Sequence, residues 1–323
     1  MHQTHKYKIS VIIPVYNVEK YIEKCVESLF NQTFDSIEYI FIVDASPDES
    51  YQKILFTLDK YPDKKKDVRF ILHDHNKGVA ASRAEGIIMA TGEYLIHCDP
   101  DDFVEPDIYR LLYEKAILSN ADIVVCDLAV EYFDHQEIVS YHFKGSPLNY
   151  LKEGRKNNFN YANLYNKLIK KSIFDKHKIL PYKGCDYGED LGIIIQVLYY
   201  AKRIEWVNIP LYHYCRRQDS ITGRFLTYEV FVTRVNLTKS ISEFLEKRKM
   251  KLLAATLKFN LKTECRQFFR TQEKEDEWFD LFKESHKYIL FFPNFSLKER
   301  LLWFLALNNR KAYKFFLHKV KKI

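Results

Sequence analysis

Short apolar runs alternate with amphipathic segments through the first half of the chain. The first run, Ile9–Pro14, precedes a segment from about Glu19 to Phe30 whose apolar residues recur on one helical face. The later runs are Glu38–Val43, Val68–Leu72, Tyr94–Cys98 and Asp122–Cys126, with helical segments that begin near Asp48, Gly78 and Pro106. Strands that alternate with helices are typical of βα units. The sequence therefore predicts an α/β fold with a mostly parallel sheet flanked by helices.

The second half of the chain has a different pattern. Residues 132–163 are irregular and contain glycine and proline, which predicts hairpins or loops at one end of the sheet. A helix is expected over Asp190–Ala201, and the segments from about Thr227 onward are helical throughout. We therefore expect a boundary near Phe225, between a domain of residues 1–225 and a helical C-terminal region of residues 226–323.

Polar residues follow each predicted strand of the first half. In an open α/β sheet, ligands bind in the crevice beyond the carboxyl ends of the strands. The segments expected at that edge are Pro14–Asn17, Asp44–Asp48, Asp74–Lys77 and Asp99–Asp102. A ligand site is predicted among them.

Composition and charge narrow the class of protein. Hydrophobic residues make up 47% of the 323 residues, with only 9 Gly and 9 Pro, which excludes a disordered or low-complexity chain. The six cysteines are scattered without a CxxC pair, so neither a zinc site nor a disulfide framework is expected. The first residues contain no apolar secretory segment, and we expect a cytoplasmic protein.

The net charge of +7 is concentrated at the C-terminus. Residues 296–323 contain eight Lys or Arg against the single acidic residue Glu299, so the remainder of the chain is neutral overall. A basic surface for nucleic acid would have to consist of this tail alone. We therefore expect no nucleic-acid partner.

The acidic segment Asp99–Asp102 carries the strongest chemical signal. An apolar strand ends there in three carboxylates within four residues. Like charges repel at such close range, and a divalent cation commonly holds them together. The alternative is an acidic turn or a helix cap, since Asp favours those positions as well.

The motifs together resemble those of the family 2 glycosyltransferases, which have the Rossmann-like GT-A fold, invert the anomeric centre and build bacterial cell-surface polysaccharides. The resemblance covers about residues 7–225. The matching segments, in order, are Ser10–Asn17, Val43–Ser50, Asn76–Val79 with Arg83, Ala90–Tyr94, Asp99–Asp102, Gly188–Asp190 and Leu211–Thr222.

The resemblance implies a site for a nucleotide-sugar donor. Pro14, Tyr16 and Asp44 would border the base and ribose, and Asp99 would lie near the ribose and a metal ion. Arg83 would bind the donor phosphates or organise the pocket. Many relatives carry two aspartates where this chain has Val43 and Asp44, so the expected base contact depends on Asp44 alone.

The resemblance also implies a metal and a catalytic base. Asp101, with Asp99, would coordinate Mn²⁺ or Mg²⁺ on the donor diphosphate. Asp190 would be the general base, and Glu189 would bind the acceptor or fix Asp190. A helix-start carboxylate such as Asp190 has a second interpretation, since it stabilises a helix N-terminus without any catalytic role.

The segment from Leu211 to Thr222 resembles the part of the family that closes over the active site. It includes His213, Arg216 and Arg217. Cys215 stands where an arginine is common, and Arg216 and Arg217 would compensate for it. As an isolated feature, a strand histidine such as His97 or His213 is more often a buried structural residue than a ligand.

The aromatic-rich tail has two interpretations. The apolar run Leu301–Leu307 is far shorter than the ~20 residues that span a bilayer. It would either cap the protein as a helix or lie in a membrane interface with its lysines on anionic headgroups. The second interpretation suits an acceptor that is linked to lipid.

We conclude that the sequence predicts an inverting, metal-dependent glycosyltransferase. It would move a sugar, from a UDP-sugar in the first instance, to a hydroxyl of a glycan or lipid-linked glycan, at the inner face of the plasma membrane if the tail binds lipid. A catalytically silent nucleotide-binding module is the alternative from another class. A metal-dependent nucleotidyltransferase is disfavoured, because the segment after the first strand, Pro14–Asn17, lacks a glycine-rich basic loop.

Overall fold

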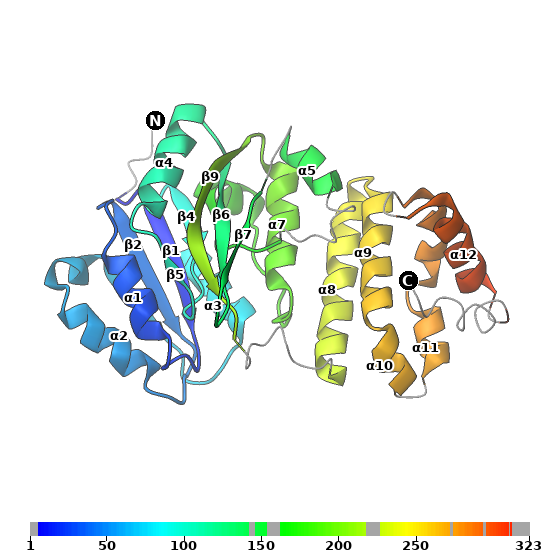
Figure 1. Ribbon diagram of the computed structural model, residues 1–323, viewed down its shortest axis with the longest axis horizontal. Coiled ribbons are helices and arrows are strands. Elements are labelled where there is room, and N and C mark those ends of the chain that lie inside the picture. Colours follow the sequence, from blue (N-terminus) through cyan, green and yellow to red (C-terminus); the bar gives the residue numbers. More distant parts are fainter. Residues whose placement is uncertain are drawn as a thin grey trace. The chain divides into compact units, whose positions relative to one another are not determined.

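A computed structural model describes most of the chain as two compact units (Figure 1). The first unit comprises Met1–Tyr150 and Tyr161–Arg224, and the second comprises Leu151–Asn160 and Phe225–Ile323. The described residues are 6–141, 146–153, 162–217, 227–271, 274–292, 295–309 and 311.

A nine-stranded sheet forms the centre of the first unit, in the order β3-β2-β1-β4-β8-β6-β9-β5 with β7 paired to β6. The strands are β1 Ile9–Val15, β2 Ile37–Val43, β3 Val68–Leu72, β4 Tyr94–His97, β5 Phe103–Val104, β6 Ile123–Glu131, β7 Gln136–Val139, β8 Lys167–Lys170 and β9 Ile204–Cys215. The four strands from β3 to β4 are parallel, as the βα pattern predicts. Beyond them the sheet is mixed, because β8 runs antiparallel to both β4 and β6.

Helices cover the sheet and bury its apolar side chains. They are α1 Ile22–Phe30, α2 Ser50–Asp59, η1 Pro62–Asp67, α3 Val79–Met89, α4 Ile108–Ser119, α6 Lys171–His177 and α7 Glu189–Tyr200. The helix α5 Pro147–Glu153 belongs to the first unit up to Tyr150 and to the second from Leu151. Alternate residues of β1 and β2, such as Val11 and Phe41, share one core with α1 and α4. The helix α3 packs closely on the sheet at Gly86, where a Cβ atom would lie 2.4 Å from the Ile12 side chain.

The helix α1 begins at Ile22, three residues after the predicted start at Glu19. The backbone amides of residues 17–19 donate hydrogen bonds to side chains that follow β2, at 2.8–3.1 Å. The accepting side chains are Ser46, Ser50 and Asp48. These bonds hold residues 17–19 as a loop, so the helix starts only at Ile22.

Three strands, β5, β8 and β9, were not predicted. The last of them contains Leu211–Tyr214, which the sequence places at the start of the closing segment. Its pattern is interrupted by Pro210, and the register of β9 against β6 shifts on both sides of Asp127, which pairs with that proline. A proline within an apolar run argues against a strand, and here the irregular pairing accommodates it. Residues 218–226, which include Ser220–Thr222, lie outside the described part of the chain.

The second unit is helical, as predicted from about Thr227. Its elements are α8 Tyr228–Lys247, α9 Lys251–Glu264, α10 Arg266–Thr271, α11 Glu275–Asp280, η3 Lys283–Phe291 and α12 Leu297–Asn308. The Thr227 side chain caps α8 by accepting a bond from the Val230 amide at 3.3 Å. An aromatic core that includes Phe259, Trp278 and Phe292 joins the helices. In the described residues, no helix is long and apolar enough to cross a membrane.

Candidate functional site

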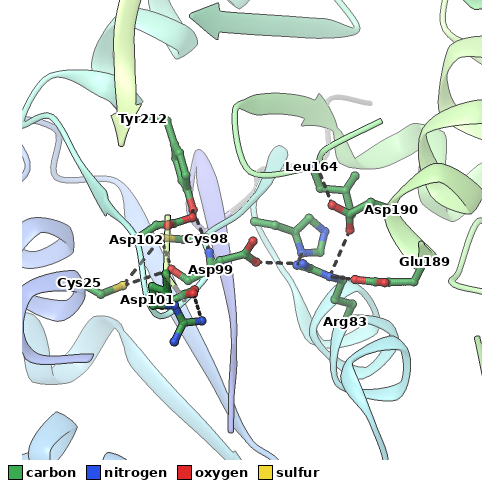
Figure 2. Close-up of polar contacts among 12 residues, drawn as sticks. Cys25, Arg83, Cys98, Asp99, Asp101, Asp102, Leu164, Glu189, Asp190 and Tyr212 are labelled. Atoms are coloured by element: carbon green, nitrogen blue, oxygen red, sulfur yellow. Dashed lines mark hydrogen bonds and ion pairs between the residues drawn. The ribbon is translucent and has the colours of Figure 1, made fainter. Parts of the chain in front are cut away.

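Arg83 lies at the centre of the candidate site, between carboxylates from two other elements (Figure 2). Its side chain, on α3, is 4% exposed. Nη2 donates to Asp99 Oδ1 at 2.9 Å, just beyond β4. On the other side, Nε donates to Glu189 Oε1 at 3.2 Å and lies 3.4 Å from Asp190 Oδ1, in the first turn of α7. The Arg83 guanidinium therefore brings together three carboxylates from two separate motifs, Asp99 and the pair Glu189 and Asp190.

The N-terminus of α3 is anchored by Asp44, which follows β2. Its carboxylate accepts hydrogen bonds from the backbone amides of Lys77 at 2.8 Å and Gly78 at 2.9 Å. His73 bridges Asp44 and Glu85, at 2.6 and 3.0 Å. Because both oxygens of Asp44 bond to the chain and the residue is 3% exposed, its direct effect is to fix α3. The predicted contact of Asp44 with a nucleotide base stays a prediction.

A second contact ties α3 to the segment before α7. Gly78 has φ 89°, a conformation that favours glycine, and a Cβ atom there would meet Asp186 Oδ1 at 2.4 Å. The same oxygen accepts a hydrogen bond from the Ala80 amide at 2.9 Å. This close approach places the start of α7 beside Arg83. Asp186 was not singled out from the sequence, which contains no local signal for a contact 106 residues away.

The charges around Arg83 separate the roles of the two acidic residues on α7. Burial and the neighbouring Asp190 raise the pKa of Glu189 to about 8. Burial also raises the pKa of Asp190, but Arg83 opposes that shift. Burial lowers the pKa of Arg83, and Asp190, Asp99 and Glu189 more than reverse this, so the guanidinium stays charged. The raised pKa of Glu189 favours its protonated form, whereas Arg83 favours the ionised form of Asp190.

The two oxygens of Asp190 have different surroundings. Oδ2 accepts a hydrogen bond from the Leu164 amide at 3.2 Å, as Figure 2 shows. Oδ1 is buried and, within the described residues, has no hydrogen-bond partner, although the Arg83 guanidinium is near it. The side chain as a whole keeps 20% exposure. Oδ2 is thus held in place by the chain, while Oδ1 can still accept a proton.

The acidic residues after β4 also differ in their surroundings: Asp102 is bonded to the chain and Asp101 pairs with an arginine. Asp102 is 2% exposed and accepts hydrogen bonds from the Tyr212 hydroxyl at 2.7 Å and the Cys215 amide at 2.8 Å. Asp101 forms an ion pair with Arg217. Burial and the charge of Asp99 raise the pKa of Asp101 to about 6, against the opposing effect of Arg217.

The fit of a divalent cation can be judged from these carboxylates. In the described part of the chain, no three His, Cys, Asp or Glu side chains are grouped to hold a metal. Mg²⁺ is commonly bound by only one or two carboxylates, with substrate phosphates completing the shell. Asp99 and Asp101 repel each other, which a bound cation would relieve, and each also pairs with an arginine, Arg83 or Arg217. Asp102 is held by the Tyr212 hydroxyl and the Cys215 amide. Asp99 and Asp101 fit a metal that arrives with a phosphate ligand.

The remaining predicted residues lie nearby in the first unit. Pro14 is buried in β1, and the Tyr16 side chain just beyond it is 46% exposed. His97 is buried against Arg83 Nη1 at 3.2 Å, and burial holds its pKa well below the usual range. An uncharged His97 therefore adds no positive charge to the site.

His213 lies within β9 rather than in a loop. Its ring bonds to Glu131 at 2.6 Å and Glu105 at 2.8 Å, and stacks on Phe103 with 4.2 Å between ring centroids. The Arg216 guanidinium, just after the strand, lies 5.6 Å from the centre of the Tyr132 ring. These contacts hold His213 in the sheet, and closure of the segment beyond it stays a prediction.

Leu164 was not found from the sequence, and Tyr212 was included only as part of the segment Leu211–Thr222. The backbone amide of Leu164 has no side-chain signature, and Tyr212 is an ordinary core aromatic by its pattern. The Tyr212 hydroxyl connects the site, since it accepts from the Asp99 amide at 3.1 Å and donates to Asp102. The Tyr212 contacts accompany the pairing of β9 with β5, which sets Tyr212 opposite Val104 and His213 opposite Phe103.

Known proteins resemble this chain in fold and in sequence. The structure of S. aureus TarS residues 1–349 in complex with UDP-GlcNAc superimposes with a TM-score of 0.70 at 18% identity, over 94% of this chain and 88% of that one. EpsH of Bacillus subtilis, assigned as a glycosyltransferase, is 32% identical over 255 residues, 74% of this chain and 69% of its own. The minor teichoic acid biosynthesis protein GgaB of the same organism is 28% identical over 67% of this chain but only 24% of its own length.

These likenesses bear on fold and family. The superposition with TarS confirms the predicted GT-A-like α/β fold. The sequence profile of glycosyl transferase family 2 matches residues 10–178, which include β1 to β8 and the acidic cluster. With the identity to EpsH, that match is sufficient: the chain belongs to glycosyl transferase family 2.

Proposed function

We propose that this chain is an inverting glycosyltransferase in which Asp190 is the general base. The observation that carries the proposal is the state of the Asp190 carboxylate. Its Oδ2 is held by the Leu164 amide, and its Oδ1 lies beside Arg83 without a hydrogen bond in the described residues. An acceptor hydroxyl is a weak nucleophile until such a base takes its proton.

The reaction is a single displacement. The acceptor oxygen attacks the anomeric carbon, the bond from that carbon to the diphosphate breaks, and the hydroxyl proton passes to Asp190 Oδ1. The nucleoside diphosphate leaves with the bonding electron pair, and the configuration inverts. A retaining route needs a second ionised carboxylate as nucleophile, as in glycosidases. Glu189 does not suit that role, because its pKa of about 8 keeps it protonated near neutral pH.

The donor is proposed to be a UDP-sugar. The support is the fold shared with TarS, which was crystallised with UDP-GlcNAc. Asp99 and Asp101 would hold a Mn²⁺ or Mg²⁺ ion, which when bound stabilises the negative charge of the diphosphate as a Lewis acid. Pro14 and the exposed ring of Tyr16 would border the base. Arg83 keeps Asp99 ordered toward this donor side while it holds the base.

The acceptor is proposed to be a glycan or a lipid-linked glycan of the cell surface. The support is the similarity to GgaB, a minor teichoic acid biosynthesis protein.

A donor panel tests the proposed class. The protein is incubated with UDP-glucose, UDP-galactose, UDP-N-acetylglucosamine and GDP-mannose, with and without Mn²⁺, and nucleoside diphosphate release is measured. We expect hydrolysis of one UDP-sugar that depends on Mn²⁺. Tight binding of UDP without any release would instead identify a silent nucleotide-binding module. Pyrophosphate release from UTP and a sugar phosphate would identify a nucleotidyltransferase.

Replacement of Asp101 by Ala should abolish the metal-dependent part of UDP affinity. A lost ligand oxygen leaves the diphosphate charge uncompensated, so calorimetric titration with UDP should give the same weak affinity with and without Mn²⁺. Asp35→Ala is the matched control, since the Asp35 side chain is fully exposed. Metal-assisted binding that survives in Asp101→Ala would contradict the assignment of this ligand.

The helix α12 supports a peripheral membrane location for the enzyme. One face packs inward, with Ala306 and Leu307 buried and Trp303 against Phe259 at 5.4 Å between centroids. A stripe spaced by four residues remains exposed, at 69%, 48% and 51%: Leu297, Leu301 and Leu305. The basic residues of 296–323 surround and follow it in sequence. We propose that this stripe inserts into an anionic membrane surface.

Conversion of the stripe to glutamine, Leu297→Gln with Leu301→Gln and Leu305→Gln, should remove co-sedimentation with phosphatidylglycerol vesicles. Glutamine is a good helix former, so circular dichroism and donor hydrolysis should not change. Leu118→Gln on α4 is the control, because Leu118 is 87% exposed in the first unit. Equal vesicle binding by the triple variant and the wild type would overturn the membrane proposal.

A further inference from the structure

Lys167, the first residue of β8, is buried in the first unit with its ammonium group fully engaged. The residue is 1% exposed. Nζ donates to the Asn163 carbonyl at 2.7 Å, to Asn163 Oδ1 at 2.9 Å and to Asn166 Oδ1 at 2.8 Å. An ammonium group has three protons, and each has an acceptor here. The reaction described above makes no use of this residue.

The three hydrogen bonds close a turn of the chain on itself. Asn163 Nδ2 donates to Asn166 Oδ1 at 3.1 Å, and the Lys167 amide donates to the Leu164 carbonyl at 3.1 Å. Asn166 Nδ2 fixes the turn to β6 through the Cys126 carbonyl at 2.6 Å. The turn of residues 163–166 is therefore held at both ends by polar contacts.

The amide of Leu164, inside this turn, is the group that donates to Asp190 Oδ2. Leu164 itself is fully buried. The direction of its N–H bond is set by the backbone of residues 163–166, and Lys167 is the charged group that holds this backbone. A shift of the turn would rotate the Asp190 carboxylate, with a direct effect on its second oxygen.

The buried ammonium group of Lys167 costs folding free energy because burial removes it from water. This cost favours a functional role for the residue. Burial lowers the pKa of Lys167 to about 7, while Asp190 and Cys126 act in the opposite direction. Reciprocally, Lys167 helps to lower the pKa of Asp190. A buried ammonium bonded only to neutral oxygens adds little net stability compared with an apolar residue of similar size.

We propose that Lys167 is a positioning residue for Asp190: its ammonium group holds the turn of residues 163–166, whose Leu164 amide orients the carboxylate. The catalytic meaning of this arrangement rests on the proposed function, since it takes Asp190 as the base. The positioning itself is a property of the folded chain and can be measured without substrate.

The first test is spectroscopic. The protein is labelled with [¹⁵N]leucine, and the Leu164 amide resonance is identified by its loss in Leu164→Met. The variant Lys167→Met removes the ammonium but keeps the length of the side chain. We expect the Leu164 resonance to move upfield, in the same direction as in Asp190→Asn, because in both variants its hydrogen bond to a carboxylate weakens. Lys170→Met, on the same strand but partly exposed, should leave the resonance in place.

The second test is kinetic and uses the UDP-sugar that the wild type hydrolyses fastest. Lys167→Met should lower kcat by about 10- to 100-fold, with the Kd for UDP and Mn²⁺ nearly unchanged. In the Asp190→Asn background the same change should have almost no further effect, because the group on which Lys167 acts is absent. If Lys167→Met does not fold, Asn163→Ala at a half-buried position removes one of the acceptors and should act in the same direction.

The outcomes distinguish the two proposals. An unchanged Leu164 resonance in both Lys167→Met and Asn163→Ala would overturn the positioning role, whatever the activity. Equal and additive losses in the wild-type and Asp190→Asn backgrounds would also overturn it, because the residues would then act independently. A shifted resonance in a protein that hydrolyses no nucleotide-sugar would uphold the positioning of Asp190 and contradict the proposed function instead.

Discussion

Turnover is expected to fall by ~10²–10⁴-fold when Asp190 is replaced by Asn, with the affinity for UDP nearly unchanged. The amide has almost the same shape as the carboxylate and can still accept a hydrogen bond from the Leu164 amide. It cannot accept the proton of the acceptor hydroxyl. Steady-state hydrolysis of the preferred UDP-sugar and calorimetry with UDP and Mn²⁺ measure the two quantities separately.

The pH dependence of turnover follows from the same residue. Burial raises the pKa of Asp190 above its ordinary value, and a general base must be ionised to act. Turnover of the wild type should therefore fall as the pH decreases through this raised pKa. The residual turnover of Asp190→Asn should lack that acidic decline.

Glu189→Gln is the matched control, because the two residues are adjacent on α7 and both lie near Arg83. The glutamine resembles the protonated Glu189 that its raised pKa favours, so most activity should remain. An inactive Glu189→Gln beside an active Asp190→Asn would move the base to Glu189 but keep the enzyme class. Activity in both variants would leave the inverting mechanism without a base.

Arg83→Met is expected to be the most destabilising single change in the first unit, by about 3–5 kcal/mol. It leaves Asp99, Glu189 and Asp190 without the buried cation that they share. Urea unfolding followed by circular dichroism measures the loss. The loss should shrink as the pH is lowered through the raised pKa of Asp190, since protonation removes a charge that the variant leaves uncompensated.

Two further variants bracket this result. Arg83→Lys keeps the charge, but one ammonium group cannot reproduce a fork that reaches three carboxylates, so we expect partial loss. Arg110→Met removes an arginine that pairs with Asp107 and Glu114 on the surface, and little change is expected. If Arg83→Met were as harmless as Arg110→Met, the carboxylates would not depend on the guanidinium.

The parts of the fold that the sequence predicts are those with regular local patterns. Strands β1 to β4 and the helices after them have apolar runs of ordinary length, and their boundaries fall within a few residues of the prediction. The strand β9 was missed because Pro210 interrupts its pattern and only the shifted register against β6 accommodates it. A pairing between segments more than 80 residues apart has no trace in either segment alone.

In the candidate site too, residues in local motifs could be predicted from the sequence, whereas their contacts with one another could not. Asp99 was found because a carboxylate after an apolar strand is a local feature, whereas the roles of Arg83 and Asp190 came from the family resemblance of their segments. Their meeting on one guanidinium depends on the contact of Gly78 with Asp186, a tertiary feature. For His213 the sequence suggested a place in a closing segment, but the structure holds it in the sheet. Its partners are Glu131 at the end of β6 and Glu105 just after β5, which the sequence around His213 does not indicate.

The close packing of Gly86 on the sheet fixes the position of α3, and therefore that of Arg83, from outside the site. Gly86 lies one helical turn after Arg83 on α3, and a methyl group there would meet the Ile12 side chain of β1. Any larger residue at position 86 must push the helix outward or displace the isoleucine, and a displaced helix carries the guanidinium with it. All three ion pairs of Arg83 would lengthen together. The distance between α3 and the sheet thus sets how firmly Arg83 holds Asp190 and Asp99. Gly86 itself contacts neither of these residues.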